Sequence, residues 1–223
     1  MNNLSKRDKD KQTHETEILN AAEKIFCTKG YDAAGMDEIA REARFTKRTV
    51  YQYFENKEDL YAAVVKVALN RLMSRIRGIN RFETTGYDKL ERFCINYHQL
   101  YRENPQMIRL IEQWSRLKDS ASVSAKHKEE LVRIGREITR GIAEMIEEGK
   151  HDGSIQSGLD TERSAACLKF MITGFYNQLS AAEGKLDSED AEKSEDLSSY
   201  VIELLIKPMK RCKTVIATRK GTA

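Results

Sequence analysis

The sequence predicts an all-α protein of about nine helices. Three observations support this fold class: apolar residues recur every three or four positions in one segment after another, only 2 prolines occur among 223 residues, and 33% of the residues are charged. A β-sandwich or barrel needs more frequent turn residues than this. No apolar run approaches the roughly 18 residues of a membrane span, and residues 1–11 carry no apolar signal segment. We therefore expect a cytoplasmic protein without a membrane partner.

Three short helices are expected between residues 18 and 60, followed by a longer fourth helix. The first carries an apolar stripe that ends at Gly30, a residue suited to a helix C-cap. The second has acidic residues in its first turn, where the helix dipole favours them. Thr46 and Asn56 are the expected N-caps of the third and fourth helices. Three such helices with a tight turn before the third have the sequence form of a helix-turn-helix unit.

Five more helices follow. The pair Asn104-Pro105 separates two of them, because proline ends one helix and suits the first turn of the next. The acidic stretch 183–196, which contains Gly184, is expected to be a loop before the last helix. Apolar stripes place the five helices at about residues 90–101, 105–117, 124–149, 160–182 and 195–207.

The expected third helix carries side chains suited to DNA. Residues 44–54 include three basic residues and no acidic one. A helix of this kind fits the major groove, where lysine or arginine binds guanine and glutamine binds adenine. Tyrosine and lysine nearby are phosphate-contact types, and a lysine that starts the next helix adds to the positive end of that helix dipole. The expected DNA contacts are Arg44, Thr46, Lys47, Arg48, Thr49, Tyr51, Gln52, Tyr53 and Lys57.

Residues 18–60 resemble the tetracycline-repressor (TetR) family of transcription regulators. The resemblance rests on residues 46–54 (TKRTVYQYF) and 56–60 (NKEDL), at the family's spacing from Phe26, Gly30-Tyr31 and Ile39-Ala40, and it covers about a fifth of the chain. It implies a homodimer that reads a near-palindromic operator with the third helix. It also implies that Lys47, Arg48 and Thr49 face the groove, that Tyr51 and Tyr53 touch backbone or base methyls, and that Lys57 holds a phosphate.

Two departures from the family pattern affect the expected DNA contacts. The family usually has glycine where this chain has Arg44, at a site that is expected to need positive φ, so arginine costs about 1 kcal/mol there. That arginine is also placed to reach a phosphate. The family usually places serine or threonine before the second helix, whereas this chain has Ala34-Gly35. Glycine is an acceptable N-cap, but it removes a side chain that touches phosphate.

The C-terminal part combines aromatic stripes with neighbouring polar residues. Apolar walls with a few placed polar groups are typical of small-molecule pockets, although an ordinary helical core has the same composition. The resemblance favours an effector-binding and dimerising domain at 57–223, after a DNA-binding domain at 1–56, with residues 160–182 and 195–207 at the dimer interface. The candidate effector-binding residues are Phe93, Tyr97, His98, Tyr101, Met107, Trp114, Phe175 and Asn177.

No enzyme, metal site or cofactor is expected. The four cysteines, at positions 27, 94, 167 and 212, have no metal-ligand spacing, and Glu148-x-x-His151 lacks the second such pair that a di-metal site needs. The sequence therefore predicts a DNA-binding repressor that an apolar or amphipathic small molecule releases from its operator. The alternatives are an activator or a partner-controlled regulator of the same fold, a helical carrier or enzyme with a vestigial head, and a purely structural dimer.

Overall fold

The computed structural model describes residues 5–79, 81, 83–182 and 188–211. Over these residues the chain forms nine α-helices and one short 3-10 turn, so the all-α prediction is confirmed. The helices are α1 Lys6–Ala33, α2 Met36–Glu42, α3 Lys47–Tyr53, α4 Lys57–Ile79, α5 Gly86–Glu103, α6 Pro105–Leu117, α7 Ala125–Asp152, α8 Thr161–Ala182 and α9 Ser188–Ile206, with the turn at Lys207–Met209. None of these helices is long and apolar enough to cross a bilayer.

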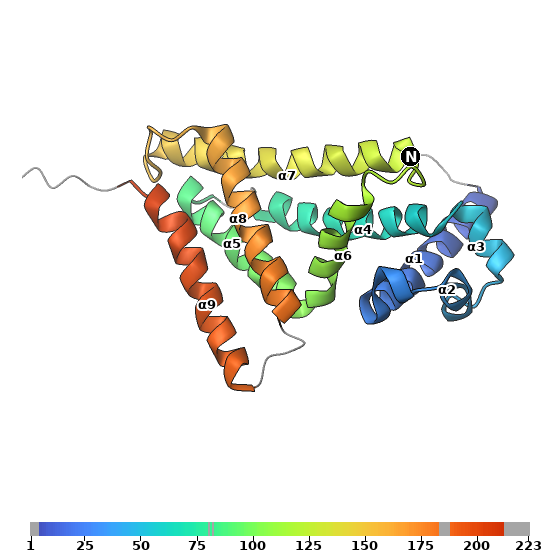
Figure 1. The fold of residues 1–223 in the computed structure, drawn as a ribbon. Helices are drawn as coiled ribbons and strands as arrows, with labels where there is room; N and C mark the ends of the chain where they lie inside the picture. The colour runs from blue at the N-terminus through green and yellow to red at the C-terminus, as the bar shows by residue number, and fades with distance from the viewer. Residues whose placement is uncertain (1–4, 80, 82, 183–187, 212–223) are drawn as a thin grey trace, which may run out of the picture.

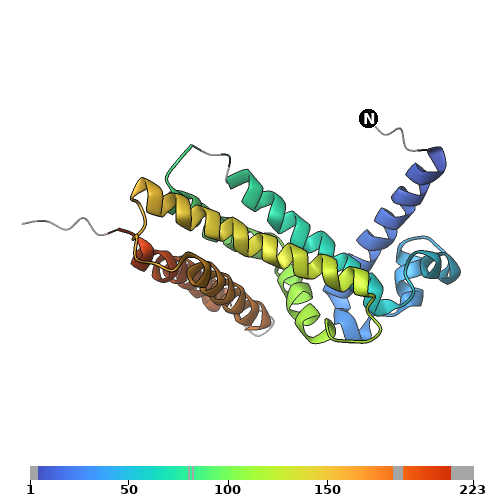
Figure 2. The same ribbon diagram turned by 90° about the horizontal axis from the view of Figure 1, so that it is seen from above.

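The molecule has a head, made of α1, α2 and α3, and a body, made of α4 to α9 (Figure 1). The helices α4 and α7 both begin near the head and run side by side to the far end of the body (Figures 1 and 2). The chain returns through α5 and α6, and α6 packs against α1 of the head. The helices α8 and α9 lie remote from α2 and α3, on the outside of the body (Figure 1).

The head is built around its own group of buried side chains. Ile18, Ile39 and Val50, one from each head helix, are fully buried against one another and against Leu60 of α4. The same cluster includes Leu110 and Leu131 of the body. Head and body therefore share apolar contacts, so a shift of α4 or α6 strains the packing of the head.

The N-termini of α4 and α7 are joined by polar contacts. The Asp59 carboxylate accepts a hydrogen bond from the backbone N–H of Ser124 at 2.8 Å and lies 3.1 Å from His127 Nδ1. Burial acts to raise the pKa of Asp59, but the hydrogen bonds from Ser124 and His127 outweigh it and lower the pKa below 3.8. The Asn56 side chain caps α4 at the Asp59 N–H, as predicted, and also donates to the carbonyl of Ser122.

The opposite end of the body is fixed by a backbone contact between α5 and α7. A Cβ atom on Gly86 would lie 2.1 Å from the backbone nitrogen of Gly149, and one on Gly149 would lie 2.6 Å from the Ile155 side chain. The Gly86 N–H also donates to the Asp152 carboxylate at 2.7 Å. Gly86 is therefore required by the close approach of α5 to α7, and Gly149 by the close approach of the Ile155 side chain.

The structure corrects two expected boundaries. The first helix begins at Lys6, well before residue 18, while Gly30 interrupts it as predicted, with φ 77° and ψ 169°, before one more helical turn to Ala33. The expected loop at 183–196 is wrong from Ser188 onwards, where α9 begins, while residues 183–187 lie outside the described part of the chain. Acidic residues directly after Ser188 suit the first turn of a helix, which explains why this acidic stretch is helical.

Candidate nucleic-acid interface and ligand pocket

The helix α3 has one buried and one exposed face. Thr46 begins it as the predicted N-cap, because its side chain accepts a hydrogen bond from the Thr49 N–H at 3.1 Å. Val50 is fully buried against the head, which fixes the rotation of the helix. The remaining side chains of the predicted set on this face, those of Lys47, Arg48, Tyr51 and Gln52, are exposed, while that of Thr49 is half-buried.

The Lys47 side chain makes an ion pair on the surface of the head. Its Nζ lies 2.9 Å from Asp37 Oδ2, and the hydrogen bond to Asp37 raises the pKa of Lys47. Both side chains are more than half exposed. An exposed pair of this kind is weak and screened by salt, so Lys47 is available for an exchange of partner from Asp37 to a DNA acceptor.

The two tyrosines of α3 differ in their surroundings. Tyr51 is 43% exposed, which the predicted DNA contact requires. Tyr53 is half-buried against the head, and its hydroxyl lies 3.3 Å from His14 Nδ1 of α1. His14 also packs against Phe45, at 4.9 Å between ring centroids. Tyr53 therefore ties α3 to α1 in this structure.

Lys57 is bound to the end of α1. Its Nζ donates to the carbonyls of Tyr31 at 2.8 Å and Ala34 at 3.1 Å, and lies 3.4 Å from that of Asp32. It also lies 4.3 Å from the centre of the Tyr31 ring. Unpaired carbonyls at a helix C-terminus attract a lysine, and this contact was missed because it joins residues more than 20 positions apart. The phosphate contact of Lys57 stays a prediction.

Arg44 occupies the glycine position of a Schellman motif. Its φ is 60°, which confirms that this site needs a positive φ. The Phe45 N–H donates to the Ala40 carbonyl at 2.9 Å and the Arg44 N–H to the Arg41 carbonyl at 3.1 Å, the bond pair that defines the motif. Gly35 is the N-cap of α2 and provides no side-chain hydrogen bond, as its lack of a side chain predicts.

Four of the candidate effector-binding residues surround Tyr176, an aromatic residue of the same part of the chain that is not in the candidate set. The ring of Tyr176 lies 4.9 to 5.8 Å from the rings of Tyr97, His98, Tyr101 and Phe175. Burial raises the pKa of Tyr97 to about 12 against the opposing hydrogen bond of Thr173. We call these five residues the Tyr176 cluster.

The other candidates lie around this cluster or away from it. Phe93 and Met107 are buried in the same body core. The Asn177 Oδ1 is buried and has no hydrogen-bond partner among the described residues. Trp114 packs with the head cluster, so it is separated from the rest of the predicted set. That these residues bind an effector stays a prediction.

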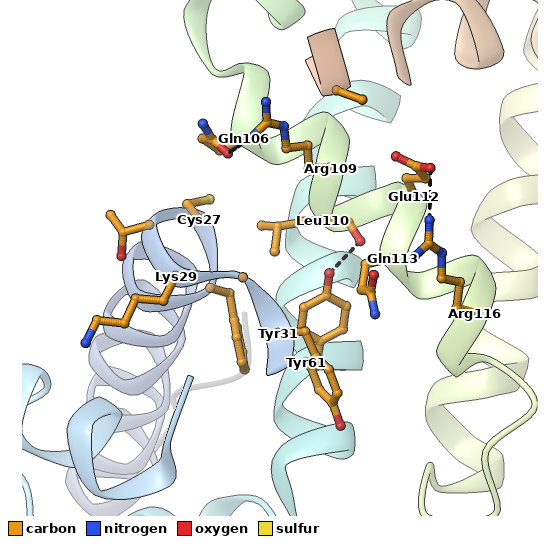
Figure 3. Close-up of a pocket in the computed structure, with 14 residues that line it drawn as sticks. Cys27, Lys29, Tyr31, Tyr61, Gln106, Arg109, Leu110, Glu112, Gln113 and Arg116 are labelled. Carbon is orange, nitrogen blue, oxygen red and sulfur yellow. Dashed lines mark hydrogen bonds and ion pairs between the residues drawn. The ribbon is translucent and has the colours of Figure 1, made fainter. Parts of the chain in front are cut away.

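The structure opens a cavity of about 410 Å³ between head and body (Figure 3). We call it the junction pocket. Its walls come from the end of α1, from α4, from α6 and from α8, so no stretch of sequence could have revealed it. It is lined by Phe26, Cys27, Thr28, Lys29, Gly30, Tyr31, Tyr61, Gln106, Arg109, Leu110, Glu112, Gln113, Arg116 and Ala181.

The head of the chain matches a known protein family. Residues 18–64 match the family described as bacterial regulatory proteins, tetR family. The transcriptional activator FasR of Mycolicibacterium smegmatis is 36% identical over 95 residues, which are 43% of this chain and 43% of that protein. The fatty acid metabolism regulator of Bacillus subtilis is 25% identical over 152 residues, or 68% of this chain and 76% of that protein.

Solved structures share the fold over most of the chain. The regulator FadR from Bacillus subtilis, solved in complex with stearoyl-CoA, has a TM-score of 0.69 at 21% identity and covers 87% of this chain and 98% of its own. A tetR-family protein from Rhodococcus RHA1 also has a TM-score of 0.69, at 22% identity, over 89% of this chain and 98% of its own. The relatives named here are transcriptional regulators, which confirms the expectation that the protein is not an enzyme. The head of the chain thus matches the tetR family of bacterial regulatory proteins, and the chain has the fold of solved tetR-family regulators.

Proposed function

We propose that the protein is a homodimeric, effector-responsive repressor that binds a near-palindromic operator through α3. The observation that carries this proposal is the capped helix α3, which buries Val50 and exposes Lys47, Arg48 and Gln52. Residues 1–56 form the DNA-binding domain and residues 57–223 the effector-binding and dimerising domain. Two copies would place their α3 helices in successive major grooves, about 34 Å apart.

The proposed dimer interface is the outer face of α8 and α9. Large apolar side chains are exposed there, and isolated chains rarely expose so many from two adjacent helices. Phe170 is 69% exposed and Tyr200 is 56% exposed. A second copy of the same face would cover them in an isologous contact. The face also includes Met171, Leu197 and Leu204.

The proposed effector is a long-chain acyl thioester or a similar amphipathic molecule, bound at the Tyr176 cluster. The relatives support this choice, since one is named a fatty acid metabolism regulator and another was solved with stearoyl-CoA. The buried rings around Tyr176 offer an apolar wall, and the Asn177 Oδ1 offers a polar atom without a described partner. Entry of an acyl chain would separate these rings and shift α5 and α8, between which they lie.

Release from DNA requires that the effector favour one state of the dimer. An effector that binds the DNA-bound and free conformations equally well leaves the affinity for DNA unchanged. The shared packing of Leu110 and Leu131 with the head is the proposed route of coupling. An activator of the same fold remains the second candidate, because the relative FasR is named an activator.

The first test is fluorescence anisotropy with DNA from upstream of the protein's own gene, with unrelated competitor DNA and at two salt concentrations. We expect binding that survives competitor, and a loss of about 1–3 kcal/mol with relaxed sequence preference for Lys47→Ala and Arg48→Ala. Arg133→Ala, on the exposed side of α7, is the control. Equal binding to all DNA, abolished by salt, would refute the proposal, since only phosphate contacts would remain.

The second test adds stearoyl-CoA to the protein–operator complex. A repressor released by acyl thioesters loses DNA affinity, whereas an activator of this fold keeps or gains it. Tyr176→Leu removes the centre of the Tyr176 cluster and should change the acyl-CoA concentration needed, while DNA binding without acyl-CoA stays unchanged. If free coenzyme A acts as well as stearoyl-CoA, the acyl-chain assignment is wrong.

A further inference from the structure

We propose that the junction pocket is a second ligand site, which binds a small organic anion with an aromatic ring. The site is separate from the Tyr176 cluster, and its occupation does not require that DNA be bound. Only the consequence for DNA affinity, given last, rests on the proposed function.

The floor of the pocket is a rigid group of aromatic rings. The ring of Tyr61 lies 4.8 Å from that of Phe26 and 5.1 Å from that of Tyr31, both in edge-to-face geometry. The Tyr61 hydroxyl donates to the Leu110 carbonyl at 2.8 Å, and the residue is 1% exposed (Figure 3). Such rings favour another aromatic ring, which would continue the edge-to-face or offset packing.

The polar wall of the pocket contains Arg109, whose positive charge is not paired with any carboxylate of the described residues. Arg109 donates from Nε and Nη2 to the Ser180 carbonyl, and from Nη1 to Gln106 Oε1 at 3.3 Å. All of its partners among the described residues are uncharged. A guanidinium has five N–H donors, so its two terminal nitrogens keep N–H groups for an anion.

Two other cations border the pocket, and each is paired with one carboxylate. Arg116 is 70% exposed and lies 3.7 Å from Glu112, which also lines the pocket. Lys29 pairs with Glu38 at 2.6 Å on the surface of the head. With these two pairs formed, the charge of Arg109 is the positive charge of the lining that no described carboxylate balances, which favours an anionic ligand.

The size and position of the pocket fit a ligand that touches head and body together. A volume of about 410 Å³ lies within the usual range for small-molecule sites, roughly 300–1,000 Å³. Figure 3 shows the end of α1 on one side of the pocket and α6 on the other, with Tyr61 of α4 between them. A ligand in this place would fix the distance between α1 and α6.

The test uses 8-anilinonaphthalene-1-sulfonate (ANS), an aromatic sulfonate whose fluorescence rises in apolar sites, with the full-length protein and no DNA. We expect saturable binding of one ANS per chain. Arg109→Gln should weaken it about tenfold, as expected for the loss of one charge-assisted hydrogen bond. Gln113→Trp, which fills the pocket from α6, should abolish it. Benzoate should compete with ANS, whereas the uncharged benzyl alcohol should not.

Arg140→Gln is the matched control. Arg140 is 74% exposed and lies 3.7 Å from Glu144, so its exposure and its ion pair resemble those of Arg116, but it lies on α7 away from the junction pocket. It should leave ANS affinity within about twofold of the wild type, while Arg116→Gln weakens it. Equal effects of Arg116→Gln and Arg140→Gln, or unchanged affinity in Gln113→Trp, would overturn the proposal. If Arg109→Gln fails to fold, the ANS affinities of Arg116→Gln and Gln113→Trp decide whether ANS binds in the junction pocket.

A separate measurement connects the site with DNA. ANS at saturation should change the affinity of the wild type for its operator, and Gln113→Trp should remove this response without changing the response to stearoyl-CoA. Loss of operator binding in every condition would refute the proposed function and leave the ANS result standing. Normal operator binding with no saturable ANS site would refute the junction site alone.

Discussion

Replacement of Lys57 by methionine tests the contact between α4 and the end of α1. Methionine keeps most of the apolar stem and removes the ammonium, which leaves the carbonyls of Tyr31 and Ala34 without their partner. A hydrogen bond to a charged group contributes about 1.5–3 kcal/mol, and the contact over the Tyr31 ring adds about 0.5–1 kcal/mol. Because water reaches these half-exposed groups, we expect a net loss of about 2–3 kcal/mol.

The assay is thermal unfolding at one fixed protein concentration, since unfolding of the proposed dimer would depend on concentration. For a chain of this length, the loss corresponds to a decrease in Tm of about 5–10 °C. Lys47→Met is the control: its ion pair with Asp37 is exposed, so Tm should stay unchanged. The salt dependence of DNA binding should fall in Lys47→Met. An unchanged Tm in Lys57→Met would refute this reasoning, and a salt slope lowered by about one in the same variant would show that Lys57 also contacts a phosphate, as the sequence predicts.

Three further substitutions test the backbone and the link between α4 and α7. Arg44→Gly should raise stability by about 0.5–1 kcal/mol, because φ of 60° strains any residue with a Cβ; Arg44→Ala should give no such gain, and an equal gain would contradict the reasoning. Asp59→Asn should lower stability by about 1–2 kcal/mol at neutral pH. Because folding lowers the pKa of Asp59, its contribution to stability is complete above pH 3.8 and is lost as the pH falls below that value. The free energies of urea unfolding of the wild type and the variant should therefore converge in acid, and a difference that stays constant with pH would contradict this reasoning. Gly86→Ala should cost about 3 kcal/mol or more, because its Cβ would overlap the backbone of Gly149, whereas Gly78→Ala, with open space around it, should stabilise the helix slightly; similar urea midpoints for the two variants would show that the helix crossing is loose.

Much of the fold could be predicted from the sequence because helical periodicity and caps are local signals. Thr46 and Asn56 cap α3 and α4 as expected, and Asn104-Pro105 separates α5 from α6. The start of α9 was mispredicted, since a run of acids is typical both of a loop and of the first turn of a helix. Gly30 interrupts the first helix as expected, and helical geometry resumes after it only for the short piece that ends at Ala33.

The candidate sites could be predicted only in part, because their geometry depends on contacts between distant residues. The exposed positions of α3 follow from its cap and from the buried Val50, both within a few residues. The partner of Lys57 lies more than 20 residues away, and the centre of the aromatic cluster, Tyr176, lies on a different helix from Tyr97 and Tyr101. The junction pocket draws on four helices, so no spacing along the chain indicates it.

The close contact between Gly86 and Gly149 holds one end of α7 at the far end of the body, so a rotation of α7 about this contact moves its other end most. From Gly149 to His127 the helix covers 22 residues, or roughly 33 Å at 1.5 Å per residue. A rotation of about 5° around this contact displaces the His127 end by roughly 3 Å. That end is bound to Asp59 at the base of the head. A small angular change near the crossing would therefore displace the proposed DNA-binding surface by nearly the separation of neighbouring base pairs, about 3.4 Å.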